Sequence, residues 1–284
     1  MLKQRVVTAI VLLAILLPAL FYRTAVPFCA VALVLIAAGA WEWGRLNGCS
    51  QAISVLLALV CVVLGGLSWY AGLLGKPLPV LWILTSAAWV LAGAWLLRQG
   101  VPGWARIPRG LRVVGGLVAL CLAWLAVAQA RVIGINFLLS ILLLVWVADI
   151  FAYFAGRALG GRFSKGKLAP SISPGKSWEG VWGGMLGVVV LALSWVALDD
   201  PSKATGFSGS LYARLWAVHG AAVLLVAVVF LAAMSVVGDL VESLIKRSAG
   251  VKDSSRLLPG HGGVLDRVDA LLPALPLAMM LASL

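Results

Sequence analysis

The chain has 284 residues, of which 63% are hydrophobic and 11% are charged, and its formal net charge is +12. A mean hydropathy of +1.07 excludes an ordinary soluble domain, in which apolar segments are shorter and broken by a polar face. In a membrane protein the positive charge indicates orientation and contact with anionic membrane lipid, so we expect no nucleic-acid partner.

Long apolar runs, of roughly 17–23 residues, recur along the whole chain. They predict an all-α, polytopic integral membrane bundle of about nine transmembrane helices, because β-barrel strands would be shorter and would alternate in polarity. The predicted spans cover approximately Val6–Tyr22, Ala25–Ala40, Ala52–Tyr70, Leu78–Leu97, Val113–Ala130, Val132–Ala155, Trp178–Leu198, Leu215–Val237 and Val268–Leu284.

The first span follows Lys3 and Arg5, so a cleaved signal peptide is one interpretation of it. No small-x-small cleavage site follows, and the many further spans favour a first anchoring helix instead.

The basic residues indicate the topology. If the N-terminus is cytoplasmic, the opposite side carries only Arg23, Lys76, Arg131, Lys203 and Arg214 among the 22 basic residues. The asymmetry predicts N-in, C-out. We expect a multi-pass protein of a bacterial-type inner (plasma) membrane.

The chain divides into two parts of different character. We expect residues 1–130 to be scaffold spans with dimer or lipid contacts, and 131–284 to be a catalytic membrane domain with its active site at the cytoplasmic face. Every acid except Glu42 lies beyond about residue 140. The stretch "WEWGRLNG" around Glu42 is interpreted as an interfacial aromatic belt with an anchoring acid–base pair.

The first polar cluster is "ADIFAYFAGRALGGRFSKGKLAPSISPGKSWEG", from Ala148 to Gly180. Asp149, Tyr153 and Arg157 share one helix face, and an ionisable group at the end of an apolar run needs a partner. The Gly-Lys-Ser triplet is not a phosphate loop, because no GxxxxGK[ST] pattern follows a strand. The loop either binds phosphate near the start of the next helix or only fixes topology. Its candidate phosphate donors are Lys165, Lys167, Ser171, Ser173, Lys176 and Ser177.

The second cluster runs from Ser235 to Ala270, "SVVGDLVESLIKRSAGVKDSSRLLPGHGGVLDRVDA". Asp239, Glu242 or Ser243, and Lys246 form one stripe of a helix. Asp266 and Asp269 share a face of the next helix. Oxygen ligands with few histidines suit Mg²⁺ or another hard cation, and an ion-paired loop with a helix cap is the alternative. Gly262 and Gly263 would let the backbone approach a ligand closely. A zinc site at His261 is not supported, because no further histidine or cysteine is near.

At these residues the sequence resembles the phosphatidate cytidylyltransferase (CDP-diacylglycerol synthase) family. Ser243–Asp269 matches the family signature and Lys167–Gly180 resembles its second motif, with Ser177 where the family often has Thr. The resemblance implies that CTP and phosphatidate give CDP-diacylglycerol and pyrophosphate. It also implies a divalent metal on Asp239 and Asp266 (Mg²⁺, with room for a second cation) and a homodimer in the membrane.

The predicted site combines these clusters. We expect catalytic roles for Asp239, Lys246, Lys252, Asp253, His261, Asp266 and Arg267. We expect substrate binding by Asp149, Tyr153, Lys167, Ser173, Lys176, Ser177, Glu179, Arg247, Gly262, Gly263 and Asp269. Two rival functions are another CTP-using lipid enzyme, such as a polyprenol kinase that would release CDP, and a transporter. The acids gather at one face rather than at mid-membrane, which argues against a transporter.

Overall fold

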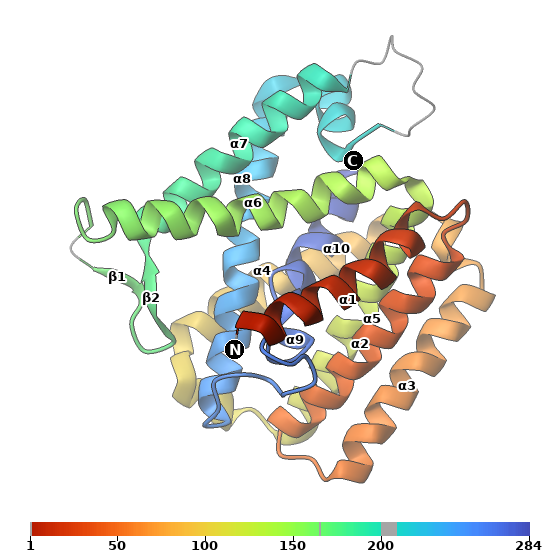
Figure 1. Ribbon diagram of the computed structural model, residues 1–284, viewed down its shortest axis with the longest axis vertical. Helices are drawn as coiled ribbons and strands as arrows, with labels where there is room; N and C mark the ends of the chain where they lie inside the picture. The colour runs from red at the N-terminus through yellow and green to blue at the C-terminus, as the bar shows by residue number, and fades with distance from the viewer. Residues whose placement is uncertain (1, 165, 200–208) are drawn as a thin grey trace.

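The computed structural model describes residues 2–164, 166–199 and 209–284 (Figure 1). Lys165 and Lys203, which entered the sequence predictions, lie outside the described residues. The elements are α1 (Leu2–Phe21), α2 (Val26–Leu46), α3 (Gln51–Tyr70), η1 (Leu73–Gly75), α4 (Pro79–Arg106), α5 (Arg109–Ile133), α6 (Ile135–Leu159), β1 (Lys167–Ala169), β2 (Ser173–Ser177), α7 (Trp178–Leu198), α8 (Leu211–Ser248), α9 (Leu265–Val268) and α10 (Leu271–Leu281).

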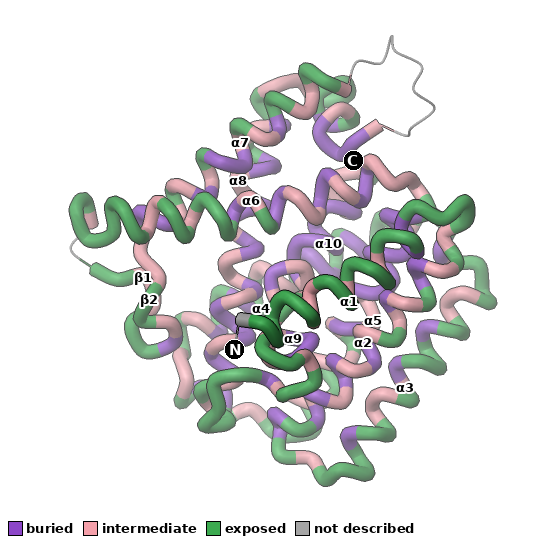
Figure 2. Tube along the Cα trace, viewed as in Figure 1, coloured by how far each residue is buried: buried purple, intermediate pink, exposed green. Residues whose placement is uncertain are grey.

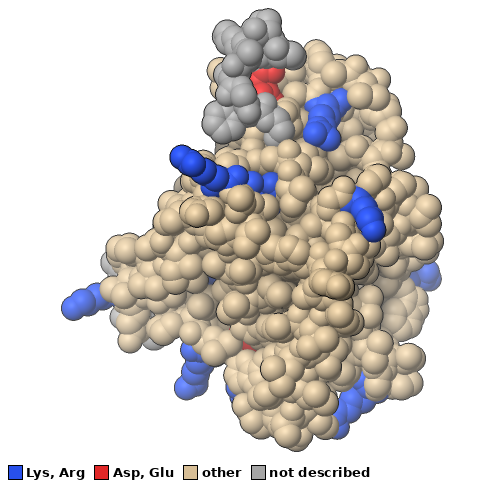
Figure 3. Space-filling view, turned by 90° about the vertical axis from the view of Figure 1, so that its right-hand side faces the viewer, with Lys and Arg blue, Asp and Glu red and all other residues tan. Residues whose placement is uncertain are grey.

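The predicted polytopic helical membrane fold is confirmed. Within the described residues, α1 to α8 are the eight helices that are long and apolar enough to cross a membrane. Apolar side chains on α1 and α3 are largely exposed, as lipid-facing helices require (Figure 2). Figure 3 shows a side of the molecule that is almost entirely uncharged, with isolated Lys and Arg side chains.

The last apolar run departs from the expected count of about nine spans. It forms α10, which has only 11 residues. At 1.5 Å per residue such a helix is about 16 Å long, roughly half of the hydrocarbon thickness of a bilayer. Its residues 273–279 are buried, and it packs against α4, α5, α6 and α8. The run predicted as a ninth span is therefore an interior helix, whose hydrophobicity reflects burial in protein.

The helix ends group at two opposite ends of the bundle. At one end, Thr8 of α1 donates a hydrogen bond to the carbonyl of Pro259, and Ser248 at the end of α8 donates to the carbonyl of Val101. At the other end, Arg131 of α5 donates to carbonyls at and just after the end of α1. The α8–α9 loop therefore contacts α1 at one end of the bundle, and the end of α5 contacts the end of α1 at the other.

Close packing of α6 on α7 places the first polar cluster. A Cβ atom on Gly180 would lie 2.9 Å from the carbonyl oxygen of Ala152, and one on Gly184 would lie 2.7 Å from that of Ala148. Small residues permit this approach in membrane helices. Beyond α6 the chain turns back as a short antiparallel hairpin, in which Lys167 pairs with Ser177. The sequence had indicated only a helix-breaking loop there.

Candidate active site

A cavity of about 410 Å³ lies between α6, β2, α7 and α8. Its lining includes acidic and basic side chains. Five of the lining residues were predicted to bind substrate or to act in catalysis. These five are Asp149, Tyr153, Lys176, Ser177 and Asp239. A more apolar hollow of about 560 Å³ beside Asp199, at the other end of α6 and α7, contains none of the predicted site residues.

An ion pair links the hairpin to α8 in the 410 Å³ cavity. The Lys176 Nζ atom lies 2.5 Å from Asp239 Oδ2, and both side chains are partly exposed, at 26% and 31%. The hydroxyl of Ser243, one turn further along α8, donates to Asp239 Oδ1 at 3.2 Å. On α6, the Arg157 guanidinium donates to the Tyr153 hydroxyl oxygen at 3.0 Å. The cavity therefore presents two acidic side chains, Asp149 and Asp239, and two cationic side chains, Arg157 and Lys176, to whatever enters it.

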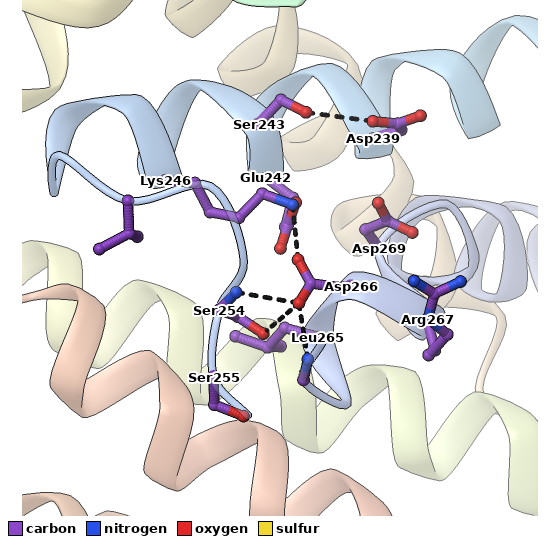
Figure 4. A network of polar contacts seen from close by, with 12 residues as sticks. Asp239, Glu242, Ser243, Lys246, Ser254, Ser255, Leu265, Asp266, Arg267 and Asp269 are labelled. Atoms are coloured by element: carbon purple, nitrogen blue, oxygen red, sulfur yellow. Dashed lines mark hydrogen bonds and ion pairs between the residues drawn. The ribbon is translucent and has the colours of Figure 1, made fainter. Parts of the chain in front are cut away.

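A second, more buried ion-pair cluster joins α8 to α9 (Figure 4). Lys246 lies between two carboxylates: it forms an ion pair with Glu242, and its Nζ is 2.6 Å from Asp266 Oδ1. The side chains of Glu242 and Asp266 are only 7% and 6% exposed. The helix face predicted on α8 thus packs against α9, and the positive charge of Lys246 partly neutralises the negative charges of Glu242 and Asp266.

Asp266 is held by donors on both of its oxygens. Oδ2 accepts hydrogen bonds from the backbone N–H of Gly263 (2.7 Å) and from the N–H and hydroxyl of Ser254 (2.9 Å each). Burial opposes ionisation, but the Lys246 ammonium and these backbone donors outweigh it, so the pKa of Asp266 is lowered. Asp266 is therefore a carboxylate in the folded protein.

Asp269 has the opposite electrostatic environment. Burial, together with the neighbouring charge of Asp239, raises the pKa of the Asp269 carboxyl to about 7. Its Oδ1 atom accepts a hydrogen bond from the N–H of Ala270 at 2.8 Å. Asp149 adds to the rise, which indicates that carboxyl groups of α6, α8 and the α9–α10 junction face a common region.

The remaining predicted catalytic residues lie in the loop between α8 and α9, except Arg267, which is in α9. Lys252 and Asp253 are exposed at the start of the loop. The loop closes on itself where Leu258 N donates to Gly262 O at 2.8 Å. The Arg267 guanidinium donates to the carbonyl of His261, and the Nδ1 atom of that histidine is buried without a hydrogen-bond partner among the described residues.

The two loop glycines have a structural explanation that the sequence did not indicate. A Cβ on Gly262 would lie 2.6 Å from Asp266 Oδ2, and Gly262 has a φ of +84°. A Cβ on Gly263 would lie 2.0 Å from the Ser254 hydroxyl and 2.4 Å from a carboxylate oxygen of Glu42. Both glycines make room for carboxylates of the protein itself.

The other predicted substrate-binding residues in or near the hairpin make contacts within the protein or lie exposed. Glu179 is buried and accepts hydrogen bonds from the N–H groups of Phe163 and Ser164 and from the Ser164 hydroxyl. Ser177 caps α7 by accepting from Gly180 N, although it also lines the cavity. The rest of this set consists of Lys167, exposed on β1, Ser173, at the start of β2, and Arg247, whose guanidinium lies 3.4 Å from the carbonyl of Ile172.

The structure also adds a residue that the sequence analysis placed elsewhere. Glu42 of α2 does not form the expected anchoring pair with Arg45, whose guanidinium lies over the Trp41 ring. Glu42 is fully buried and accepts hydrogen bonds from the α8–α9 loop and the start of α9. The only sequence signal was that Glu42 is the one acid in an otherwise plain half of the chain.

No group of three or more His, Cys, Asp or Glu residues is placed to hold a metal ion by itself within the described parts of the chain. A Mg²⁺ ion commonly uses one or two protein carboxylates and completes its shell with water and substrate phosphates. Asp239, which is partly exposed in the cavity, fits that use. Among the residues that the structure describes, Asp266 Oδ1 has Lys246 as its only hydrogen-bond donor, so it retains acceptor capacity for a cation.

Comparison with known proteins covers almost the whole chain. The model of the cytidylyltransferase family matches residues 3–284. The phosphatidate cytidylyltransferase of Pseudomonas aeruginosa is 39% identical over 285 residues, covering 97% of this chain and 95% of the relative. That of Haemophilus influenzae is 38% identical over 296 residues (97% and 96%), and that of Brucella abortus is 34% identical over 284 residues (100% and 94%).

Proposed function

Since the chain belongs to the cytidylyltransferase family, as a phosphatidate cytidylyltransferase that makes CDP-diacylglycerol, we propose that the cavity between α6, β2, α7 and α8 is where CTP and phosphatidate react. A phosphate oxygen of phosphatidate attacks the α-phosphorus of CTP in line, the bond from that phosphorus to the bridging oxygen breaks, and pyrophosphate leaves. A phosphate monoester is largely ionised near neutral pH, so neither a protein nucleophile nor a strong general base is required.

The observation that carries this proposal is the Lys176–Asp239 pair in the cavity. One substrate brings a triphosphate from water and the other a phosphate from the bilayer. A site for both must be charged and must lie where apolar helices end. The cavity meets these conditions, because α6, α7 and α8 are long apolar helices whose ends here carry both acids and bases.

The chain's own cations would bring the anionic substrates together. Lys176 and Arg157 line the cavity, and Lys176 would exchange Asp239 for a phosphate oxygen when CTP binds. Lys246, Arg247, Lys252 and Arg267 would offset the remaining phosphate charge. Glu179 would keep the loop after α6 in place, and the backbone around Gly262 and Gly263 would set the position of Asp266.

Asp239 and Asp266 would hold Mg²⁺, with room for a second cation near Asp269. When bound, the metal supplies charge neutralisation for the departing pyrophosphate. A positive charge beside Asp269 would also keep that carboxyl ionised, although burial and the neighbouring charge of Asp239 raise its pKa to about 7.

The proposal also covers the protein's membrane, its orientation, its assembly and the roles of the two parts of the chain. We place the protein in a bacterial inner membrane with its N-terminus and the cavity on the cytoplasmic side, in contact with anionic lipid and as a homodimer. Residues 131–284 carry the reaction, and residues 1–130 serve as scaffold.

A product assay tests the proposed reaction. Purified protein is given phosphatidate and CTP labelled at the α-phosphate, with and without Mg²⁺. The label should move to lipid, with release of pyrophosphate and a requirement for Mg²⁺. Release of CDP with unlabelled lipid would instead indicate transfer of the γ-phosphoryl group, and would overturn the proposed reaction.

A further inference from the structure

Glu42 is a fully buried carboxylate in the half of the chain that we assigned to scaffold. No Lys, Arg or His among the described residues forms an ion pair with it. An isolated buried charge is costly unless hydrogen bonds satisfy it. Its position on α2 therefore requires an explanation in terms of what it binds.

The donors to Glu42 come from both stems of the α8–α9 loop. Ser254 and Ser255, near the start of the loop, donate through their hydroxyls at 3.1 Å and 2.5 Å. Val264 and Leu265, at its end, donate through their backbone N–H groups at 2.9 Å and 2.8 Å. One carboxylate thus fastens the two stems of the loop to each other and to α2.

The Val264 and Leu265 amides lie at the start of α9, where helix N–H groups have no partner within the helix. Val264, the residue before α9, makes no side-chain capping bond. Glu42 supplies the missing acceptor from another helix. Because Asp266 is the second residue of α9, whatever fixes the start of α9 also fixes Asp266.

Glu42 and Asp266 also share a hydroxyl group. Ser254 Oγ lies 3.1 Å from Glu42 Oε2 and 2.9 Å from Asp266 Oδ2. A hydroxyl has one proton, so it donates to one carboxylate at a time. If Glu42 keeps its other three donors, the Ser254 proton remains available to Asp266.

We propose that Glu42 is a positioning residue for the cytidylyl transfer: it acts through Ser254 and the start of α9 to orient the Asp266 carboxylate for its cation. The inference rests on the proposed metal role of Asp266. Groups that orient metal-binding carboxylates are commonly worth about 10–100-fold in metal affinity or activity. The substrate site is thus completed by a helix from the N-terminal part.

The test measures metal binding directly on the full chain in detergent. Mn²⁺ is titrated without nucleotide and followed by electron paramagnetic resonance, for wild type, Glu42→Gln, Ser254→Ala and Asp266→Asn. Thr8→Val serves as the matched control, because Thr8 also bonds the same loop from the N-terminal part, but at Pro259 and away from α9. The Mg²⁺ concentration for half-maximal activity is measured on the same samples.

We expect Glu42→Gln and Ser254→Ala to weaken Mn²⁺ binding by about 10-fold and to raise the Mg²⁺ requirement by a similar factor, while Thr8→Val matches wild type. A purely structural role would lower the folded fraction and leave both quantities unchanged in the folded protein. That result for both variants, or equal weakening by Thr8→Val, would overturn the inference.

The Asp266→Asn variant distinguishes a wrong positioning role for Glu42 from a wrong metal role for Asp266. If Asp266→Asn weakens Mn²⁺ binding but Glu42→Gln does not, the metal role stands and the positioning role is rejected. If Asp266→Asn binds Mn²⁺ as wild type does, the metal role is wrong, and the positioning role falls with it.

Discussion

Lys176 on β2 and Asp239 on α8 form an ion pair with 2.5 Å between Nζ and Oδ2, in the cavity between α6, β2, α7 and α8. Neither residue is buried enough to require the pair for folding, since both side chains are about one quarter to one third exposed. Exposed pairs contribute little to stability, typically about 0–1 kcal/mol. We therefore interpret the pair as two substrate-facing groups that neutralise each other in the free protein.

Replacing Lys176 by Ala should weaken CTP use and leave the fold intact. A hydrogen bond from a charged donor is worth about 1.5–3 kcal/mol, so we expect the KM for CTP to rise roughly 10-fold or more. Lys176→Arg keeps the charge and should be intermediate. Steady-state kinetics at limiting CTP, with the melting temperature as a check of folding, would refute the assignment if Lys176→Ala behaved as wild type.

Gly263→Ala should damage both stability and activity, because the new methyl group would lie 2.0 Å from the Ser254 hydroxyl and 2.4 Å from Glu42. Overpacking of this kind costs about 1–3 kcal/mol. Gly115 of α5 is the control: a Cβ there has open space, and Ala should stabilise a helix by roughly 0.5–1 kcal/mol relative to Gly. Thermal unfolding in detergent should therefore shift in opposite directions for the two variants.

How much could be predicted from the sequence depends on how far along the chain each sequence pattern carries information. Apolar runs and basic loops act locally, so the span positions and the clustering of Asp149, Lys176 and Asp239 were accessible. The partners of Glu42 lie more than 200 residues away in the sequence, and nothing near Glu42 indicates them. Hydropathy also cannot separate burial in lipid from burial in protein, which is why α10 was predicted to be a span.

Glu179 should keep the loop after α6 closed to protease. Ala at this position would remove the carboxylate that accepts from the N–H groups of Phe163 and Ser164, and a hydrogen bond to a charged group is worth about 1.5–3 kcal/mol. Cleavage after the exposed Arg162 requires local opening of this loop. If the free energy of opening falls by about 1.4 kcal/mol, trypsin should cut there at least about 10-fold faster. Ser164→Ala loses only the hydroxyl contact and should be cut at nearly the wild-type rate. Equal cleavage of Glu179→Ala and wild type would contradict this anchoring role.

The orientation in the membrane can be tested by labelling single cysteines in a chain whose four native cysteines are replaced. Lys76 and Arg256 are both exposed, and the basic asymmetry places them on opposite sides of the membrane. A membrane-impermeant maleimide added to intact cells should modify Lys76→Cys and spare Arg256→Cys, and should modify both after permeabilisation. The reverse pattern in intact cells would invert the proposed topology.

Asp239→Asn and Asp266→Asn should each lose about 10²–10³-fold in cytidylyl transfer, as expected when one key electrostatic contact is removed from such a site. The two variants should differ in stability. Asp239 is partly exposed with one cationic partner, so its Asn variant should melt close to wild type. Asp266 accepts from Lys246, Ser254 and Gly263, and its pKa is lowered, so the folded state favours its charged form and an uncharged Asn should lower the melting temperature as well.

Comparing the two variants distinguishes a loss of metal binding from a loss of stability. If the carboxylates only hold the loop, Asp239→Asn should remain active, because Asp239 contacts no residue of that loop among the described hydrogen bonds and ion pairs. If they bind metal, both variants should be inactive at saturating Mg²⁺, although only one is unstable. An Asp239→Asn enzyme that retained more than about a tenth of wild-type activity at saturating Mg²⁺ would reject Asp239 as a metal ligand. The same retention in a folded Asp266→Asn protein would reject Asp266, and the acidic face of α8 would then be a structural ion-pair network.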